Sequence, residues 1–297
     1  MRRVVESLAA LVLLVQLGLT AATAAAGASG TWSIETLRDG GASLTLSSTA
    51  SGARGASVNS HDVDVAGLGI SRAFSAAGQS SVAFTLAREA GSIVCSGTAG
   101  NAAASGTFVF TPSEQFVTKM RERGYPGLSG QDLLRAATLD VTTAFVDGIF
   151  AAGYSHLPFE KLIVFRALGI DETYLRAMHQ AFAGVALGAD DLLPLRALGV
   201  TAHYVQDMRA AGLSVTEPQV AIRARALKID VDYVRDLSAA GYGRLPFEDL
   251  VRLRALGIDG AYIKRVQAHG FPHPAIEELI RLKALNVIAL RRASDAP

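Results

Sequence analysis

The chain has little of several features that commonly indicate a function. It holds a single cysteine, Cys95, among 297 residues, so an intramolecular disulfide is impossible whatever the compartment. Its formal net charge is only +1, so no overall field favours a charged polymer as partner. Region 113–287 carries 20 Lys and Arg against 20 Asp and Glu, a balance that argues against an array following a phosphate backbone. We therefore expect no nucleic-acid partner.

The motifs of common catalytic sites are also missing. The sequence contains no G-x-S-x-G elbow, phosphate-binding loop or dinucleotide fingerprint. His269 and His273 have the spacing of two metal ligands on a helix, but Gly270 and Pro272 interrupt that helix. Cys95 lies in an apolar segment and reads as a small core residue. We expect no catalytic residue, no metal and no cofactor, and hence no enzyme.

Only one run is apolar enough to interact with a membrane, and it lies at the N-terminus. Arg2 and Arg3 precede the apolar run 8–19, and small residues suited to cleavage follow at 22–26. This order predicts a signal peptide over residues 1–26 and a periplasmic or secreted protein. The alternative is an uncleaved anchor in the inner membrane, which would make the membrane a partner. We prefer cleavage, because about a dozen apolar residues fall short of the roughly 20 that span a bilayer.

Residues 28–112 are rich in Ser, Thr, Ala and Gly and alternate between polar and apolar side chains. Alternation of period two predicts strands, and glycine-bearing turns separate them. The expected strands are 31–37, 42–48, 81–86, 92–96 and 107–110. With few large side chains, this region should form a small all-β sandwich or barrel. Residues 49–80 carry the weakest pattern and could form a long loop.

One pattern of 29 residues is written six times between Ser113 and Val287, with one extra residue in the third copy near Ala183–Gly184. Every copy opens with Ser, Thr or Asp, which cap helix N-termini, and has an aromatic residue three positions later. A glycine ends this first helix in most copies, and a second helix with an acidic start follows. The opening residues are Ser113, Thr142, Asp171, Thr201, Asp230 and Asp259.

Each copy therefore reads as a short helical hairpin that is too small to fold alone. Stacked copies can share a core, so we expect an α-solenoid of six hairpins over residues 113–287 and a frayed tail over 288–297. The predicted class is α+β, divided into a small β domain and a helical array.

One column of the repeat is basic in five copies, and Ala137 breaks it in the first. Two interpretations stay open: a ladder of cations for an acidic partner, or cations that stabilise helix C-termini. We prefer the structural one. The polar positions of the first helices differ between copies, as in a surface free for binding, and there we expect binding at Arg176, Asp207, Asp236 and Arg265. The column consists of Arg166, Arg196, Arg225, Arg254 and Lys283.

The phrases FRALGIDETYLRAM and LRALGVTAHYVQDMRAAGL resemble helical repeats appended to some BlaR/MecR-type antirepressor membrane metallopeptidases and found in uncharacterised exported bacterial proteins. The run FTLAREAGSIVCSG followed by GTFVF is similar to the β-module that precedes those repeats. The resemblance covers about residues 80–287. The peptidase itself is missing, since the chain has no His-Glu-x-x-His motif and no multi-pass region. The resemblance thus implies an accessory or sensing part on the envelope side, without protease activity.

We accordingly predict an exported, non-enzymatic interaction or sensing scaffold that binds a protein or peptide partner on the repeats. The alternative is a hydrolase whose site lies in the β domain or at its junction with the repeats. A polar cluster around His61, Asp62 and Asp64 in a pocket would favour that alternative.

Overall fold

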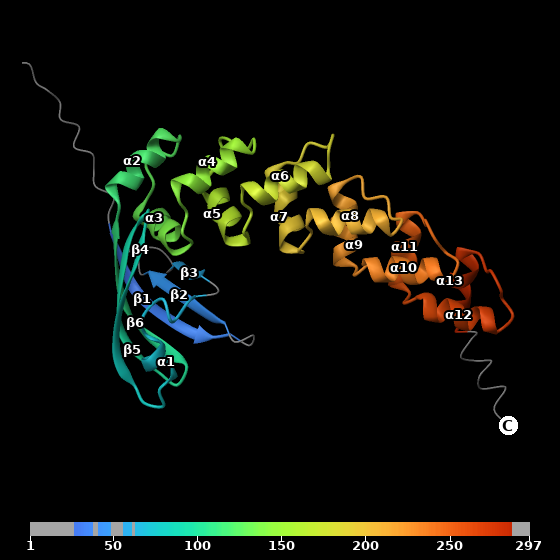
Figure 1. Cartoon of the computed structure of the whole chain (residues 1–297), viewed down its shortest axis with the longest axis horizontal. Coiled ribbons are helices and arrows are strands. Elements are labelled where there is room, and N and C mark those ends of the chain that lie inside the picture. The colour runs from blue at the N-terminus through green and yellow to red at the C-terminus, as the bar shows by residue number, and fades with distance from the viewer. Residues whose placement is uncertain (1–26, 38–40, 49–55, 61–62, 287–297) are drawn as a thin grey trace, which may run out of the picture.

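The computed structural model describes residues 27–37, 41–48, 56–60 and 63–286. It confirms the α+β class: an antiparallel sheet within residues 28–112 precedes a long series of short helices, which extends away from the sheet (Figure 1). The predicted signal peptide lies outside the described residues. Within them, no helix is both long enough and apolar enough to span a membrane.

The β region forms one sheet of six strands in the order β3-β2-β1-β6-β5-β4, with every neighbouring pair antiparallel. The short helix α1 (Ser71–Ser75) precedes β4. The strands are β1 (Ala28–Thr36), β2 (Ala42–Ser48), β3 (Ala56–Ser60), β4 (Ser80–Arg88), β5 (Gly91–Gly100) and β6 (Ala103–Pro112). Segment 49–80 is therefore more than a loop, because its described parts include β3 and α1.

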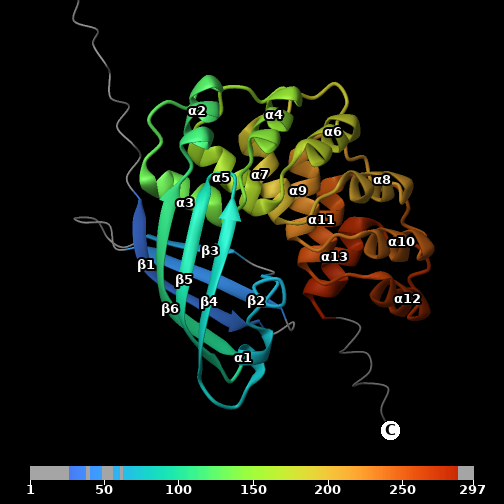
Figure 2. The ribbon, with the colours of Figure 1, turned by 60° about the vertical axis from the view of Figure 1, so that its left-hand side comes forward.

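In the described part of the chain the strands form this single sheet with one helix at each end, and the expected sandwich or barrel is not confirmed. Helix α3 (Gly130–Thr138) contacts β1, β3, β5 and β6, and α1 contacts β4 and β5 (Figure 2). The first copy of the repeat thus supplies part of the second layer that a facing sheet would provide. The layer is apolar, because Leu133, Leu134 and Ala137 of α3 are fully buried.

The core of the sheet follows the alternation of the sequence. Trp32 and Phe84 meet edge to face with ring centroids 5.0 Å apart, and Phe108 and Phe110 are buried beside them. Cys95 is fully buried in β5, and burial raises the pKa of its thiol to about 12. Because the thiolate is the reactive form, this cysteine is a packing residue rather than a nucleophile.

Twelve helices follow within residues 113–286, two in each copy. The first helices of the copies are α2 (Glu114–Glu122), α4 (Thr143–Ala151), α6 (Glu172–Ala181), α8 (Ala202–Ala210), α10 (Val231–Ala239) and α12 (Gly260–Ala268). The second helices are α3, α5 (Phe159–Leu168), α7 (Ala189–Ala197), α9 (Pro218–Ala226), α11 (Phe247–Ala255) and α13 (Ile276–Ala284).

The capping residues start the first helices as the sequence indicates. In every copy the opening side chain accepts a hydrogen bond from the backbone N–H of the aromatic residue three positions later, as Asp171 does from Tyr174 at 2.8 Å. Left-handed residues end many helices, and at the second helices of the first and fourth copies these are Asp140 and Lys228, both with φ of 55°. The third copy departs at its extra residue: α6 runs on to Ala181, and the buried Phe182 follows.

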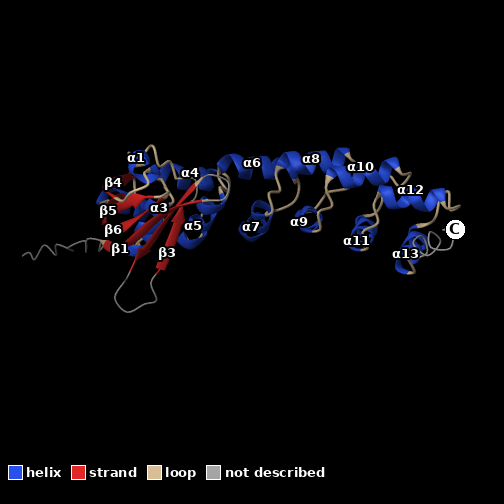
Figure 3. Ribbon diagram, turned by 90° about the horizontal axis from the view of Figure 1, so that it is seen from below, coloured by secondary structure: helices blue, strands red, loops and turns tan. Residues whose placement is uncertain are grey.

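The helices lie in two layers. Each first helix contacts the first helix of the next copy, from α2 to α12, and among the second helices α7 contacts both α5 and α9. Figure 3 shows the first helices along one side of the array and the second helices along the other. This arrangement leaves one outer face on each layer.

Candidate interaction surface of the helical array

The basic column joins consecutive copies. Each of its arginines donates from Nε to a leucine carbonyl at the end of the preceding second helix, and Lys283 donates from Nζ to the Gly257 carbonyl at 3.2 Å. The arginine bonds are Arg166 to Leu139 (3.0 Å), Arg196 to Leu168 (2.9 Å), Arg225 to Leu198 (3.1 Å) and Arg254 to Leu227 (3.3 Å). The cation therefore stabilises the C-terminus of the neighbouring helix, where carbonyls lack intrahelical partners.

Each column cation also lies over an aromatic ring of the first helix in its own copy. The distances from the cation to the ring centroid are 5.5 Å for Arg166 on Phe145, 4.8 Å for Arg196 on Tyr174, 5.1 Å for Arg225 on Tyr204, 4.7 Å for Arg254 on Tyr233 and 4.5 Å for Lys283 on Tyr262. A cation so placed connects three helices. These contacts favour the structural interpretation of the column.

The first copy shows why the column is interrupted there. Ala137 occupies the basic position on α3 and is fully buried in the layer that covers the sheet. No earlier copy precedes it to supply a helix C-terminus. A small apolar side chain is the residue that this environment requires.

Tyrosine hydroxyls form a second set of contacts, to backbone carbonyls. The Tyr174 hydroxyl donates to the Val200 carbonyl at 3.0 Å, at the end of its own copy, and burial raises the pKa of Tyr174 to about 12. Tyr154 instead donates to the Leu187 carbonyl of the next copy at 2.9 Å.

The outer face of the second helices is largely committed to bonds between copies. Arg252 forms two hydrogen bonds of 2.7 Å with Glu277 of the next copy, and Arg223 contacts Glu248 in the same way. Arg135 pairs with Glu160, and this hydrogen bond holds the pKa of Glu160 below its usual value. These side chains are neighbour-to-neighbour links, so they are poor candidates for a binding site.

The four residues that we expected to bind a partner do not form one surface. Asp236 is structural: its Oδ2 accepts a hydrogen bond of 2.7 Å from the Gly260 N–H at the start of α12. A Cβ at Gly260 would lie 2.4 Å from Asp236 Oδ1, so only glycine allows this close cap. Asp236 therefore faces the next copy and has a structural contact there, and its predicted binding role stays a prediction.

The other three expected residues have local contacts. Asp207 lies 3.2 Å from His203 on its own helix, and the guanidinium of Arg265 lies 5.7 Å from the Tyr262 ring centre. Arg176 is exposed and pairs with Glu172 one turn earlier. Of the expected residues, Arg176 is the one that belongs to the most outward row of the first helices.

That row is the surface we call the outer ridge: Arg176, Gln206, Arg235 and Lys264. All four side chains are exposed and lie on successive first helices. Gln206, Arg235 and Lys264 stand one position before Asp207, Asp236 and Arg265, and Arg176 has the same place in its own copy. Within the described residues, Gln206, Arg235 and Lys264 have no hydrogen-bonding or ion-pair partner. Helical periodicity could have identified this row, since it lies opposite the buried aromatic and the large apolar residue four positions later.

The β4–β5 turn connects the sheet to the first two copies. Glu89 accepts hydrogen bonds from the Thr143 N–H at 2.9 Å and the Thr143 hydroxyl at 2.7 Å, and Lys119 lies 3.5 Å away. Burial raises the pKa of Glu89, but the bonds from Thr143 and Lys119 outweigh it and lower the pKa overall. Glu89 thus caps the first N–H of α4, as Asp236 caps the first N–H of α12.

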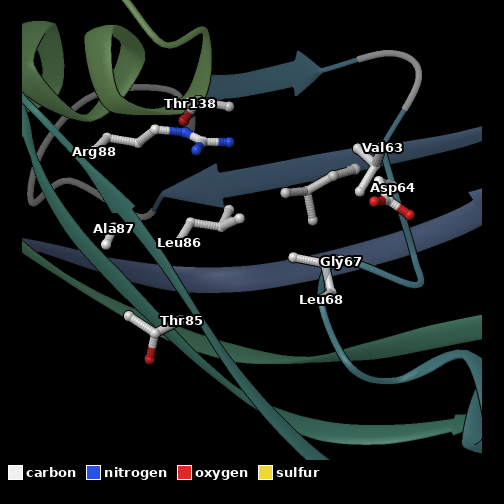
Figure 4. A pocket seen from close by; sticks show the side chains of 10 residues that line it. Val63, Asp64, Gly67, Leu68, Thr85, Leu86, Ala87, Arg88 and Thr138 are labelled. Atoms are coloured by element: carbon white, nitrogen blue, oxygen red, sulfur yellow. The ribbon is translucent and has the colours of Figure 1, made fainter.

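A pocket of about 530 Å³ lies beside this turn, between the sheet, segment 63–68 and the end of α3 (Figure 4). Arg88 lines it and lies 3.6 Å from Asp140, whose other carboxylate oxygen is 3.4 Å from Arg166. Asp64 also lines the pocket, whereas His61 and Asp62 lie outside the described residues. The cluster that would favour a hydrolase is therefore represented by Asp64 alone.

His269 and His273, which have the spacing of two metal ligands, make other contacts. His269 Nδ1 lies 2.7 Å from the Arg265 carbonyl, and the His273 ring packs against Tyr242 with centroids 5.4 Å apart. Across the described ranges, no group of three or more His, Cys, Asp or Glu side chains has the proximity needed to hold a metal ion.

Comparison with known proteins adds no family to this geometry: no model of a protein family matches the chain, and no curated protein sequence matches it significantly.

Proposed function

We propose that the chain is an exported, non-enzymatic interaction or sensing scaffold of the bacterial envelope, which binds a protein or peptide partner on its helical array. The array is, in this proposal, a solenoid of six hairpins. Export rests on the basic residues and the apolar run of the first 26 residues. The place in the envelope rests on the resemblance of the repeats to those of antirepressor metallopeptidases.

The bonds between copies support the solenoid. Column cations and arginine–glutamate pairs recur between successive copies, Asp236 caps the first helix of the next copy, and Glu89 of the sheet caps α4 in the same way. Interactions that repeat from neighbour to neighbour are the defining feature of such arrays. They also create an extended surface without a deep site, which suits a macromolecular partner.

The outer ridge is the observation that carries the binding proposal. Most cations of the array are engaged in contacts between copies. Arg235 and Lys264 are among the exposed cations without a hydrogen-bonding or ion-pair partner within the described residues, and they differ from the others of that group in standing at the same position of successive first helices. Gln206 lies between them and Arg176, so the row has a neutral side chain in one copy and a cation in the other three. A residue without a structural contact is free to vary with a partner. The ridge is therefore the binding face that we propose.

The test is a pull-down from envelope extract with the mature chain and two triple variants. Replacing Arg176, Arg235 and Lys264 by alanine should weaken capture of the same partner at least tenfold and leave the melting temperature unchanged, because exposed cations contribute little to stability.

The matched control removes three other exposed cations, Arg72, Arg121 and Arg281, which lie off the ridge. It produces the same change in net charge and should capture the partner as the unmodified chain does. Equal loss in both variants would show a general charge effect and would contradict a binding site on the ridge.

The alternative function, a hydrolase at the junction of sheet and repeats, depends on the pocket that contains Asp64. The described residues around it supply one carboxylate, one guanidinium and the hydroxyl of Thr138, which donates to the Leu134 carbonyl. The mature chain should then hydrolyse a substrate in a way that Asp64→Asn abolishes.

A further inference from the structure

The pocket at the junction of the sheet and the first copy has a mixed lining, in which apolar side chains stand beside two opposite charges. Val63, Leu68 and Leu86 contribute partly exposed apolar side chains, and Leu44 lies buried beneath the pocket lining. Its volume of about 530 Å³ lies in the range of small-molecule sites, roughly 300–1,000 Å³. The outer ridge lies on different helices, so the chemistry of this pocket is independent of the proposed partner binding.

The two charges lie on opposite sides of the pocket. Figure 4 shows Arg88 on one side and Asp64 on the other. The ion pair of Arg88 joins its Nε to Asp140, and the two terminal nitrogens have no hydrogen-bonding partner within the described residues. Such a planar pair of donors fits a carboxylate.

Asp64 complements this cation. Its Oδ1 accepts a hydrogen bond of 3.0 Å from the Ala66 N–H, which fixes the carboxylate in a local turn. A Cβ at residue 67 would lie 2.6 Å from Asp64 Oδ2, so Gly67 leaves room for this oxygen. Oδ2 has no hydrogen-bonding partner among the described residues and is free to accept from an ammonium group.

We propose that this pocket binds a short peptide with apolar side chains and free termini, its carboxylate at Arg88 and its ammonium group at Asp64. Arg88 and Asp64 lie on opposite sides of a cavity of about 530 Å³, so a ligand that reaches both needs its charges farther apart than in a single amino acid, in which both groups are attached to one carbon atom. Successive Cα atoms of a peptide are about 3.8 Å apart, so a second residue moves the termini apart. The leucines then receive the side chains between the two charged ends.

The experiment is isothermal titration of the full chain with the dipeptide Leu-Leu, its C-terminal amide and its N-acetyl form. Leu-Leu should bind saturably. Loss of either charged terminus should weaken binding about tenfold, the scale expected for one charge-assisted hydrogen bond. Absence of saturable binding by Leu-Leu, or equal binding of all three peptides, would overturn the proposal.

Two variants assign the termini to the side chains. Arg88→Met should bind Leu-Leu about tenfold more weakly but should no longer distinguish it from the amide. Asp64→Asn should do the same for the N-acetyl form. If either variant still distinguishes its pair of peptides as the unmodified chain does, that contact is wrong.

A control separates the pocket from the ion pair that Arg88 makes with the array. Asp140→Asn removes the partner of Arg88, and asparagine tolerates the positive φ of this residue. This variant should bind Leu-Leu within about twofold of the unmodified chain. A tenfold loss would show that the ion pair, rather than a peptide contact, is what Arg88 provides.

Discussion

Replacing Arg196, Arg225 and Arg254 together by methionine is expected to lower the melting temperature by about 6–12 °C and to leave partner binding unchanged. Each cation donates to the end of the preceding helix and lies over a tyrosine ring. Partial exposure reduces these contributions, so we take about 1 kcal/mol for each position. For a domain of this size, 1 kcal/mol corresponds to about 2–4 °C.

Methionine keeps helix propensity and the apolar stem of the side chain, so the loss reports the charge and its contacts. Thermal melting followed by circular dichroism measures the effect. The ridge variant at Arg176, Arg235 and Lys264 is the counterpart, with unchanged melting and weakened binding. If the column variant kept its melting temperature and lost the partner, the column would be the binding face and the ridge assignment would be wrong.

The second large effect is expected at the junction. Glu89→Ala leaves the buried N–H and hydroxyl of Thr143 without an acceptor, at a cost of about 2 kcal/mol. The melting temperature at pH 7 should fall by about 4–8 °C. Glu122→Ala, an exposed acid on α2, serves as the control and should change it little.

The stabilisation of the fold by Glu89 should decrease as the pH falls. The pKa of Glu89 is lower in the folded chain than in the unfolded one, so the ionised group stabilises the fold above the ordinary carboxyl pKa of about 4.3. That stability is lost as the pH falls through the lowered pKa. The difference between Glu89→Gln and the unmodified chain should therefore shrink from pH 7 to pH 3. A difference that is constant over this range would show that the carboxylate charge is not what stabilises the junction.

The helices of the repeats could be predicted from sequence because their signals are local. Six aligned copies act as an internal comparison, so the cap at Asp171 and the aromatic at Tyr174 stand out above background. The caps bond their own helices, and no distant contact is needed to interpret them. The β3 strand and helix α1 were missed for the converse reason. Their segment is rich in Ala, Ser and Gly and has little periodicity.

The contacts between copies could not be predicted from the sequence. Asp236 looks like a variable surface residue until α12 is placed beside it, and its cap on Gly260 is 24 residues away. Likewise, the alternation of the sheet residues reveals a buried face but not what covers it. The pattern does not specify the packing of α3 against β1, β3, β5 and β6 that the structure shows.

The most direct test of the account is deletion of the fourth copy, Thr201–Ile229, from the otherwise full chain. The fifth copy would then follow the third, and Arg254 would meet the Leu198 carbonyl that Arg225 now contacts. If stability comes from bonds between neighbouring copies, the shortened chain should keep its helical circular dichroism per residue and unfold cooperatively. Loss of the helical signal per residue, or melting without a cooperative transition, would contradict a stack of exchangeable copies.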